Sequence, residues 1–376
     1  MQTKRIEELD ALRGFALFGI LLVNVFVFHA PYSFYSEFYG TYTGLQGATV
    51  NSVVEFASGK FMFIFAFLFG YGISIQIIIH QKSFVGYFLK RMLVLLVFGI
   101  LHIVLFWFGD ILASYAILGV LVLPLRKVSN NLLLIVGTVF IFFRPLYYLG
   151  VVTLNWPMMA LNKPAELSEF MSVFQQGNYL EIFDLRIKEF IHFIPENLVW
   201  HMSKTFGLFL IGMYCARKRM FLSIKKSTTT FTFVAVVLIT ISSIWIYNKI
   251  DFFSQFDIQL QPLWRPYLIA INIVFETAMG IGYIFIFTII FQKMNTRFLA
   301  KTGRMALTNY ILQSLICVFV FYGYGFGFYG KLEPTDLVWV AICIFVLNMM
   351  FSYFYLTFKS IGPLEYVWRK LIGKQN

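Results

Sequence analysis

The chain has 376 residues, of which 59% are hydrophobic, 20% are aromatic and only 13% are charged. In a soluble domain about a quarter of the residues are charged, so this composition excludes a water-soluble protein. The net charge of +12 would favour nucleic-acid binding in a soluble protein. In a membrane protein it is typical of basic cytoplasmic loops instead. The three cysteines show no CxxC spacing and indicate neither a disulfide framework nor a metal site.

Ten apolar segments are long enough to cross a bilayer, which takes about 20 helical residues. They are residues 14–30, 61–79, 92–108, 111–125, 132–152, 198–216, 231–247, 267–291, 305–322 and 337–358. The first follows basic residues as a secretory signal would, but it lacks a small-x-small cleavage site, so we expect it to remain as a span. Arg144-Pro145 interrupts the fifth segment. The pattern predicts an all-α, polytopic membrane protein of about ten transmembrane helices.

The basic residues predict which loops face the cytoplasm. With both termini placed inside, about two thirds of the 30 Lys and Arg residues fall on the inner side, whereas most of the 18 acidic residues fall outside. Residues 153–197 form the only long connection, and the loose helical spacing of its apolar residues predicts an outer amphipathic cap. We therefore expect a single integral membrane domain, 1–376, with a five-span half at 14–152, the outer loop or cap, and a second five-span half at 198–376.

Polar side chains deep in a span are costly in lipid and usually face the bundle interior, so each is a functional candidate. At a rise of about 1.5 Å per residue, five of them lie near the middle of the bilayer. They are Asn24, His102, Glu276, Gln313 and Asn348. We expect them to share one central polar chamber. Simple hydrogen bonding between helices is an equally good account of the three amides.

Four residues are candidates for proton chemistry. His102 titrates near neutrality and lies deep in the third span, whereas His29 lies at the outer end of the first. Glu276 would orient or tune the histidine. Asp110 stands in the short turn between spans three and four, where it is either catalytic or an N-cap of span four, or both.

Four arginines are expected together at the cytoplasmic ends of the spans: Arg13, Arg91, Arg304 and Arg369. Arginines can clamp phosphates through paired hydrogen bonds, so a phosphorylated cytosolic donor is one interpretation. Contact with anionic lipid headgroups is the other.

Four stretches resemble the YeiB-like family of bacterial membrane proteins, whose C-terminal half is domain of unknown function 418. They are LDALRGF at Leu9 to Phe15 with Asn24, the run Phe98 to Gly119, GRMALTNY at Gly303 to Tyr310 with Gln313-Ser314, and GPLE at Gly362 to Glu365 with Trp368-Arg369. The resemblance covers nearly the whole chain and implies a bacterial cytoplasmic (inner) membrane protein.

The opening LDALRG with Asn24 is also similar to membrane acyltransferases that modify cell-surface glycans and to the lysosomal heparan acetyltransferase. That similarity implies transfer of an acyl group from cytosolic acyl-CoA. The glycan enzymes carry a histidine where this chain has Asn24, and an amide is no general base. Either His29 or His102 takes over, or the chemistry is absent.

Three hypotheses follow. The leading one is an acyl-CoA-dependent or acetyl-CoA-dependent acyltransferase without a metal, acting on an envelope glycan or lipid. The arginines would bind the donor, and Asn24, Asn309, Gln313 and Asn348 would bind substrate. The second is a transporter or lipid-flipping protein that uses the same polar chamber. The third is a non-catalytic membrane partner or sensor. Membrane lipids are expected partners, nucleic acid is not, and a homo-oligomer remains open.

Overall fold

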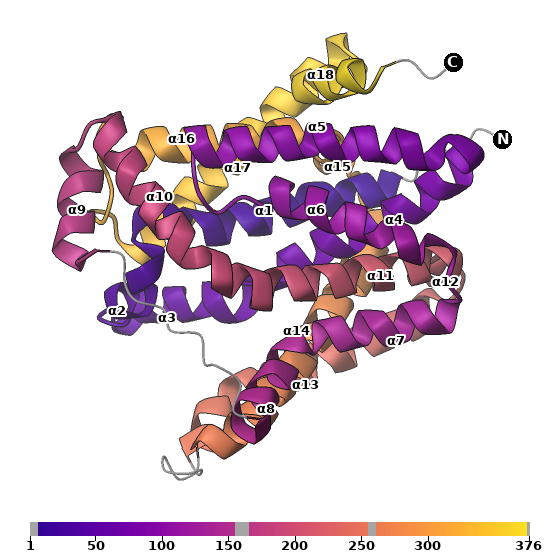
Figure 1. The fold of residues 1–376 in the computed structure, drawn as a ribbon, viewed down its shortest axis with the longest axis horizontal. Coiled ribbons are helices and arrows are strands. Elements are labelled where there is room, and N and C mark those ends of the chain that lie inside the picture. Colours follow the sequence, from indigo (N-terminus) through magenta and orange to yellow (C-terminus); the bar gives the residue numbers. More distant parts are fainter. Residues whose placement is uncertain (1–6, 155–164, 255–260, 374–376) are drawn as a thin grey trace.

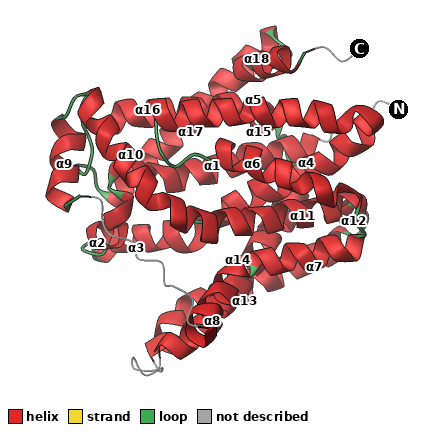
Figure 2. Cartoon of the chain, viewed as in Figure 1, coloured by secondary structure: helices red, strands yellow, loops and turns green. Residues whose placement is uncertain are grey.

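The computed structural model describes residues 7–154, 165–254 and 261–373, and every regular element in these ranges is a helix (Figures 1 and 2). Six described segments are long and apolar enough to cross a membrane. They are α1 (Glu7–His29), Gly44–His80 with α3 (Gly44–Ser52) and α4 (Lys60–His80), α5 (Phe84–Leu105), α13 (Thr228–Ser254), α14 (Gln261–Lys293) and α17 (Pro334–Phe358). The prediction of an all-helical, multi-pass membrane protein is confirmed.

Two bent helix pairs raise the number of candidate spans among the described residues from six to eight. Predicted spans four and six correspond to α6 (Leu112–Val122) and α11 (Ser203–Arg217), which have only 11 and 15 residues. Helix α6 does not reach the length of a full crossing, whereas η5 continues directly into α11, so that the sixth predicted span is helical throughout. The count of ten therefore stays a prediction, as does the side of the membrane on which each end lies.

The first bent pair joins α7 (Asn130–Ile141) to α8 (Phe143–Leu154) at an angle of 59°. Pro145 has no N–H to donate to the carbonyl of Ile141, and its ring would collide with that carbonyl in a continuous helix. The helix therefore breaks where the sequence predicted an interruption. The second pair, α15 (Arg297–Arg304) and α16 (Ala306–Phe321), is bent by 86°.

Helix α1 is the most buried of the long helices, and it packs against α4, α14, α15, α16 and α17. Its contact with α15 depends on two glycines of the YeiB-like stretches, Gly14 and Gly303. A Cβ atom on Gly14 would overlap the carbonyl of Leu299, and one on Gly303 would overlap the carbonyl of Asp10. The two backbones can approach this closely only because neither residue has a side chain.

Short helices cover the two ends of the bundle (Figure 1). One end carries η1 (Tyr32–Phe34), α2 (Tyr35–Tyr39), α9 (Leu167–Gln176) and α10 (Tyr179–Glu196), and the other carries the start of α1 and α12 (Met220–Lys226). Asn178 starts α10 because its side chain accepts the N–H groups of Leu180 and Glu181 in a capping box. Helices α9 and α10 fill the described part of the predicted cap, and residues 155–164 lie outside the described residues.

The remaining elements are connectors and the C-terminal helix: η2 (Val53–Ala57), η3 (Gln81–Ser83), η4 (Leu123–Lys127), η5 (Asn197–Met202) and α18 (Pro363–Ile372). Large apolar side chains such as Leu93, Ile135, Phe233 and Phe354 point outward from the bundle. In water this would be costly, but toward lipid acyl chains it is the expected arrangement.

Candidate functional site

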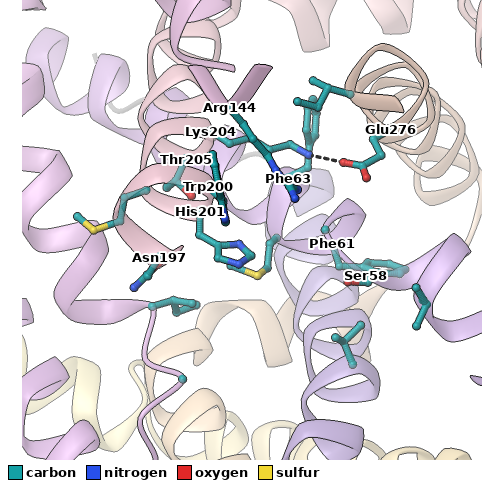
Figure 3. A pocket seen from close by; sticks show the side chains of 18 of the residues that line it. Ser58, Phe61, Phe63, Arg144, Asn197, Trp200, His201, Lys204, Thr205 and Glu276 are labelled. Atoms are coloured by element: carbon teal, nitrogen blue, oxygen red, sulfur yellow. Dashed lines mark hydrogen bonds and ion pairs between the residues drawn. The ribbon is translucent and has the colours of Figure 1, made fainter. Parts of the chain in front are cut away.

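A cavity of about 1240 Å³ lies among the ends of several helices (Figure 3). Its walls come from the second half of α1, the starts of α4, α11 and α14, helix α8, and the segment 107–111 between α5 and α6. All these helix ends lie on the side that the basic residues predict to be outer. Among the described residues, no cluster of three or more His, Cys, Asp or Glu side chains is placed to hold a metal ion.

An ion pair crosses the cavity wall between α11 and α14. Lys204 Nζ lies 2.8 Å from Glu276 Oε2, and the other carboxylate oxygen accepts a hydrogen bond of 2.9 Å from Asn272 Nδ2. The side chains of Lys204 and Glu276 are 21% and 33% exposed. Figure 3 shows this pair facing the cavity together with His201. Glu276, which the sequence placed deep in a span, therefore has a charged partner there.

Asn24 lines the cavity from α1, so the structure brings it to the same space as Glu276. Two phenols outside the spans, Tyr32 and Tyr35, also line it. Burial raises the pKa of Tyr35 to about 12. Burial, followed by the charge of Glu196, raises the pKa of Tyr32 still further. Both phenols are protonated at neutral pH and can donate hydrogen bonds to a ligand.

A second polar cluster joins the end of α5 to α16. His102 Nε2 lies 2.8 Å from the hydroxyl of Ser314, and His102 Nδ1 lies 3.1 Å from Asp110 Oδ1. The second contact is electrostatic, because neither atom meets the geometry of a hydrogen bond. The other oxygen of Asp110 accepts the N–H of Ala113 at 2.6 Å, at the start of α6. Asp110 thus binds the helix start and the histidine together.

His102 and Ser314 of this cluster lie behind the cavity wall, and Asp110 belongs to the wall itself. The side chains of His102 and Asp110 are 0% exposed, and neither His102 nor Ser314 is among the described residues that line the cavity. The segment 107–111, which does line it, separates the two. Tyr310 fixes this segment, since its hydroxyl donates to the carbonyl of Gly109 and accepts the N–H of Ile111.

His29 is placed away from both clusters, at the end of α1. Its Nε2 accepts the N–H of Leu332 at 3.1 Å, so the ring proton of the neutral form is on Nδ1. Nδ1 then donates to the hydroxyl of Tyr39 at 2.9 Å, which donates in turn to the carbonyl of Phe26. Both ring nitrogens are thus used in joining α1 to α2 and to the segment before α17.

Apart from Asn24, the amides expected to bind substrate lie on α16 and α17, outside the described cavity lining. Asn309 Nδ2 donates to Ser352 Oγ at 2.8 Å and to the carbonyl of Thr302 at 3.0 Å. Asn348 is fully buried, and neither of its side-chain polar atoms has a hydrogen-bond partner among the described residues. Nε2 of Gln313 is in the same situation. Of the five deep polar residues, Asn24 and Glu276 line the cavity.

The four predicted cytoplasmic arginines lie at the opposite end of the bundle from the cavity. Arg91 stacks on the ring of Trp368 at 4.3 Å, and the charges of Arg13 and Arg369 act on it. Arg304 donates to the carbonyl of Ser360 at 2.9 Å. Three of the four arginines are thus close together.

Sequence reasoning missed five residues of these sites: Ser314, Lys204, His201, Arg144 and Arg265. Lys204 and Arg144 stand inside predicted spans six and five, so the cost of a charge in lipid could have identified them. Ser314 stands in a YeiB-like stretch, but its pairing with His102 spans 212 residues of sequence.

Comparison with known proteins supports the family resemblance. Residues 215–375 match the family described as "Protein of unknown function (DUF418)". The chain is 28% identical to "Uncharacterized protein YxaH" of Bacillus subtilis, over 98% of this chain and 94% of that one. It is 27% identical to "Uncharacterized protein YeiB" of Escherichia coli, over 98% and 96%. No solved structure matches. The predicted resemblance to the YeiB-like family is thus confirmed, and the C-terminal part of the chain carries the DUF418 match.

Proposed function

We propose that the chain is a membrane-bound acyltransferase of the bacterial cytoplasmic membrane, which moves an acyl group from acyl-CoA to an envelope lipid or glycan. The supporting observation is the chain of side chains Asp110, His102 and Ser314 beside a large cavity. A hydroxyl held by an imidazole, with a carboxylate on the other ring nitrogen, is the arrangement used for nucleophilic acyl transfer on several unrelated folds.

In the first half-reaction Ser314 Oγ gives its proton to His102 Nε2 and attacks the thioester carbonyl. The carbon–sulfur bond breaks, and the CoA thiolate takes the proton from the imidazolium. In the second half-reaction the acceptor hydroxyl gives its proton to His102 and attacks the acyl-serine ester, and Ser314 leaves and regains a proton. Asp110 stabilises the imidazolium in both steps. Its alignment with Nδ1 is expected to improve when substrate binds, as in many resting enzymes.

This proposal requires that both the acceptor and the donor reach Ser314. The segment 107–111 must open for the acceptor to reach Ser314 from the cavity. The donor must reach it from the other end, where Arg91 stands eleven residues before His102 on α5, about 16 Å away along the helix. The pantetheine arm of CoA would bridge that separation while the arginines hold its phosphates.

The test is to incubate the purified protein with acetyl-CoA labelled in the acetyl group, with and without membrane lipids, and to look for CoA release and for a labelled peptide. We expect acetyl on the peptide that contains Ser314, and its loss in Ser314→Ala and His102→Gln. Ser58→Ala removes a cavity-lining hydroxyl outside the cluster and should keep the label. Absence of CoA release, of transfer and of protection by CoA in the unchanged protein would contradict the proposal.

A transporter or lipid-flipping protein is the second candidate, because one specific observation favours it. The ion pair between Lys204 and Glu276 faces an open cavity, and two helix pairs are broken, as in many transporters. If transport is the function, vesicles containing the protein should accumulate a substrate in response to a proton gradient, and Glu276→Gln should abolish the accumulation. A gradient-independent acyl transfer that survives Glu276→Gln would count against it.

A further inference from the structure

The cavity contains a feature that neither proposed reaction uses. Arg144 stacks on the ring of Trp200 at 4.7 Å, Trp200 stacks on Tyr148 with centroids 5.2 Å apart and planes at 19°, and Arg265 stacks on Tyr148 at 4.4 Å. We name these four residues the cation–aromatic ladder. All four line the cavity, and Figure 3 shows Arg144 and Trp200 there. They come from α8, η5 and α14, so the ladder exists only in the folded chain.

The two guanidinium groups of the ladder differ from the lysines beside them. Lys204 is neutralised by Glu276, and Lys249 by Glu55 at 2.5 Å. Within the described residues Arg144 and Arg265 form no ion pair, and the one hydrogen bond from either is that of Arg265 to the hydroxyl of Tyr148 at 3.2 Å. Two positive charges at the cavity therefore have no carboxylate within ion-pair distance among the described side chains, and the Glu276 carboxylate that acts on Arg144 is already paired with Lys204.

Stacking on aromatic rings leaves the N–H donors of these arginines available to a ligand. A ring covers the face of a guanidinium and restricts its rotation, but the N–H donors lie in the plane of the group and point past the ring. Such a group is prepared to bind two oxygens of one anion, and phosphate has the matching geometry. Two of them in one ladder favour an anion with several oxygens over a single carboxylate.

The wall beside the ladder indicates what is attached to that anion. Val151 and Val152 of α8 and Leu268, Ile269 and Ile273 of α14 line the cavity and are apolar. A free phosphate would gain nothing from this surface, whereas the acyl or polyprenyl chains of a lipid would bury against it. We propose that the ladder binds the phosphate group of an anionic amphiphile whose apolar chains lie between α8 and α14. This inference rests on the proposed function only in identifying that molecule as the acyl acceptor.

The test uses the purified full-length protein in a neutral maltoside detergent and measures its affinity for three probes: phosphatidylglycerol, a diacylglycerol with the same acyl chains, and inorganic phosphate. We expect phosphatidylglycerol to bind at least about tenfold more tightly than diacylglycerol, since charge-assisted paired hydrogen bonds are among the strongest in proteins. The preference should weaken as salt is raised. Equal affinity for the two lipids would overturn the proposal.

Variants separate the ladder from general positive charge. Arg144→Gln with Arg265→Gln should remove the preference for phosphatidylglycerol. The matched control, Lys188→Gln with Lys331→Gln, removes two charges from residues outside the cavity lining and should keep it. Arg144→Lys with Arg265→Lys keeps the charge without the planar donors and should fall between them. A preference that persists in the Gln pair overturns the proposal, and the salt dependence of the unchanged protein tests it even if that pair fails to fold.

Two further measurements identify the source of the phosphate and separate this inference from the acyltransferase proposal. Displacement of phosphatidylglycerol by millimolar inorganic phosphate supports a site for the headgroup alone, and failure of displacement supports a site that also needs the chains. If the lipid binds through the ladder but no acetyl reaches Ser314 or a lipid, the acyltransferase proposal fails and the ladder stands. If acyl transfer to phosphatidylglycerol proceeds at the unchanged rate in the Gln pair, the ladder proposal fails instead.

Discussion

The cavity ion pair and the buried histidine cluster, two polar sites in the described part of this apolar bundle, differ in what surrounds them. The ion pair of Lys204 and Glu276 faces the cavity, with side chains 21% and 33% exposed, whereas the side chains of His102 and Asp110 are 0% exposed and meet Ser314 inside the packing. An exposed pair can exchange partners with an incoming ligand. A buried cluster keeps its geometry only while the helices around it stay packed. The ion pair is therefore suited to binding a ligand, and the buried cluster is suited to holding its side chains in a fixed arrangement.

The largest expected effect tests whether the buried cluster is catalytic. Asp110→Asn keeps a side chain that can cap α6 but removes the charge beside His102, so acyl transfer should fall by roughly three to four orders of magnitude while the thermal unfolding midpoint changes little. Asp110→Ala should lower both. The measurements are turnover of labelled acetyl-CoA and thermal unfolding in detergent. Full activity in Asp110→Asn would reduce the cluster to a structural role.

The second prediction concerns helix α10, which covers the buried cluster. Arg186 of α10 donates to the carbonyls of Val104 and Phe106, just before the segment that carries Asp110. One turn later, burial raises the pKa of Glu189 from an ordinary 4.5 to about 7, although its carboxylate accepts the N–H of Ser33. The folded protein therefore holds a proton on Glu189 that the unfolded chain has already lost between these two pH values.

The contribution of Glu189 to stability should accordingly be highest below pH 4.5, decrease as the pH rises to about 7, and stay low above it, with a total change of about 3 kcal/mol. Glu189→Gln cannot ionise, so it should unfold at a higher temperature than the unchanged protein at pH 8 and at about the same temperature near pH 4.5. A constant difference between the two proteins across this range would show that Glu189 is not the titrating group.

The third prediction turns to the cavity pair. Lys204→Met or Glu276→Gln alone removes one half of the ion pair and should lower stability by about 1–2 kcal/mol, less than for a fully buried pair because both side chains are partly exposed. The double variant should be more stable than the sum of the single effects predicts, with a coupling of about 1 kcal/mol. Additive effects would mean that the two charges do not interact in the folded protein.

The smallest effects are expected at the amides between α16 and α17, where satisfied and unsatisfied groups can be compared directly. Asn309→Leu breaks the hydrogen bonds to Thr302 and Ser352 and should lower stability by about 1 kcal/mol. Asn348→Leu removes two polar atoms that have no partner among the described residues, so it should be neutral or raise stability. The measurement is the thermal unfolding midpoint of each variant, compared with that of the unchanged protein. A loss at Asn348 as large as that at Asn309 would indicate that Asn348 binds something.

Much of the fold followed from hydropathy. The positions of the long helices, the interruption at Arg144-Pro145 and the helical character of the connection that holds α9 and α10 were predictable, because they depend on residues near one another in the sequence. The cap role of Asp110 was predictable for the same reason, since the turn before α6 is short. The number of full crossings could not be predicted, because α6 is shorter than its apolar segment and two helix pairs are sharply bent.

The composition of the sites was harder to predict. Depth along a helix places Asn24, His102 and Glu276 at similar levels, but it does not state which way each side chain points. His102 turns toward α16 and Glu276 toward α11, so one expected chamber becomes a cavity and a separate buried cluster. Which helices are neighbours depends on packing between residues 72 and 212 positions apart, and a periodicity within one helix carries no information about it.

The C-terminal helix α18 has a practical consequence for anyone who handles this chain. Glu365 accepts the N–H groups of Leu307 and Thr308 and the hydroxyl of Thr308, and so completes the first turn of α16, while Trp368 donates to the carbonyl of Arg91 on α5. These two helices carry the serine and the histidine of the buried cluster. Truncating the chain before Pro363 would therefore remove the contacts of α18 with the start of α16 and with the first half of α5 at once, so this segment should be kept in protein made for crystallisation.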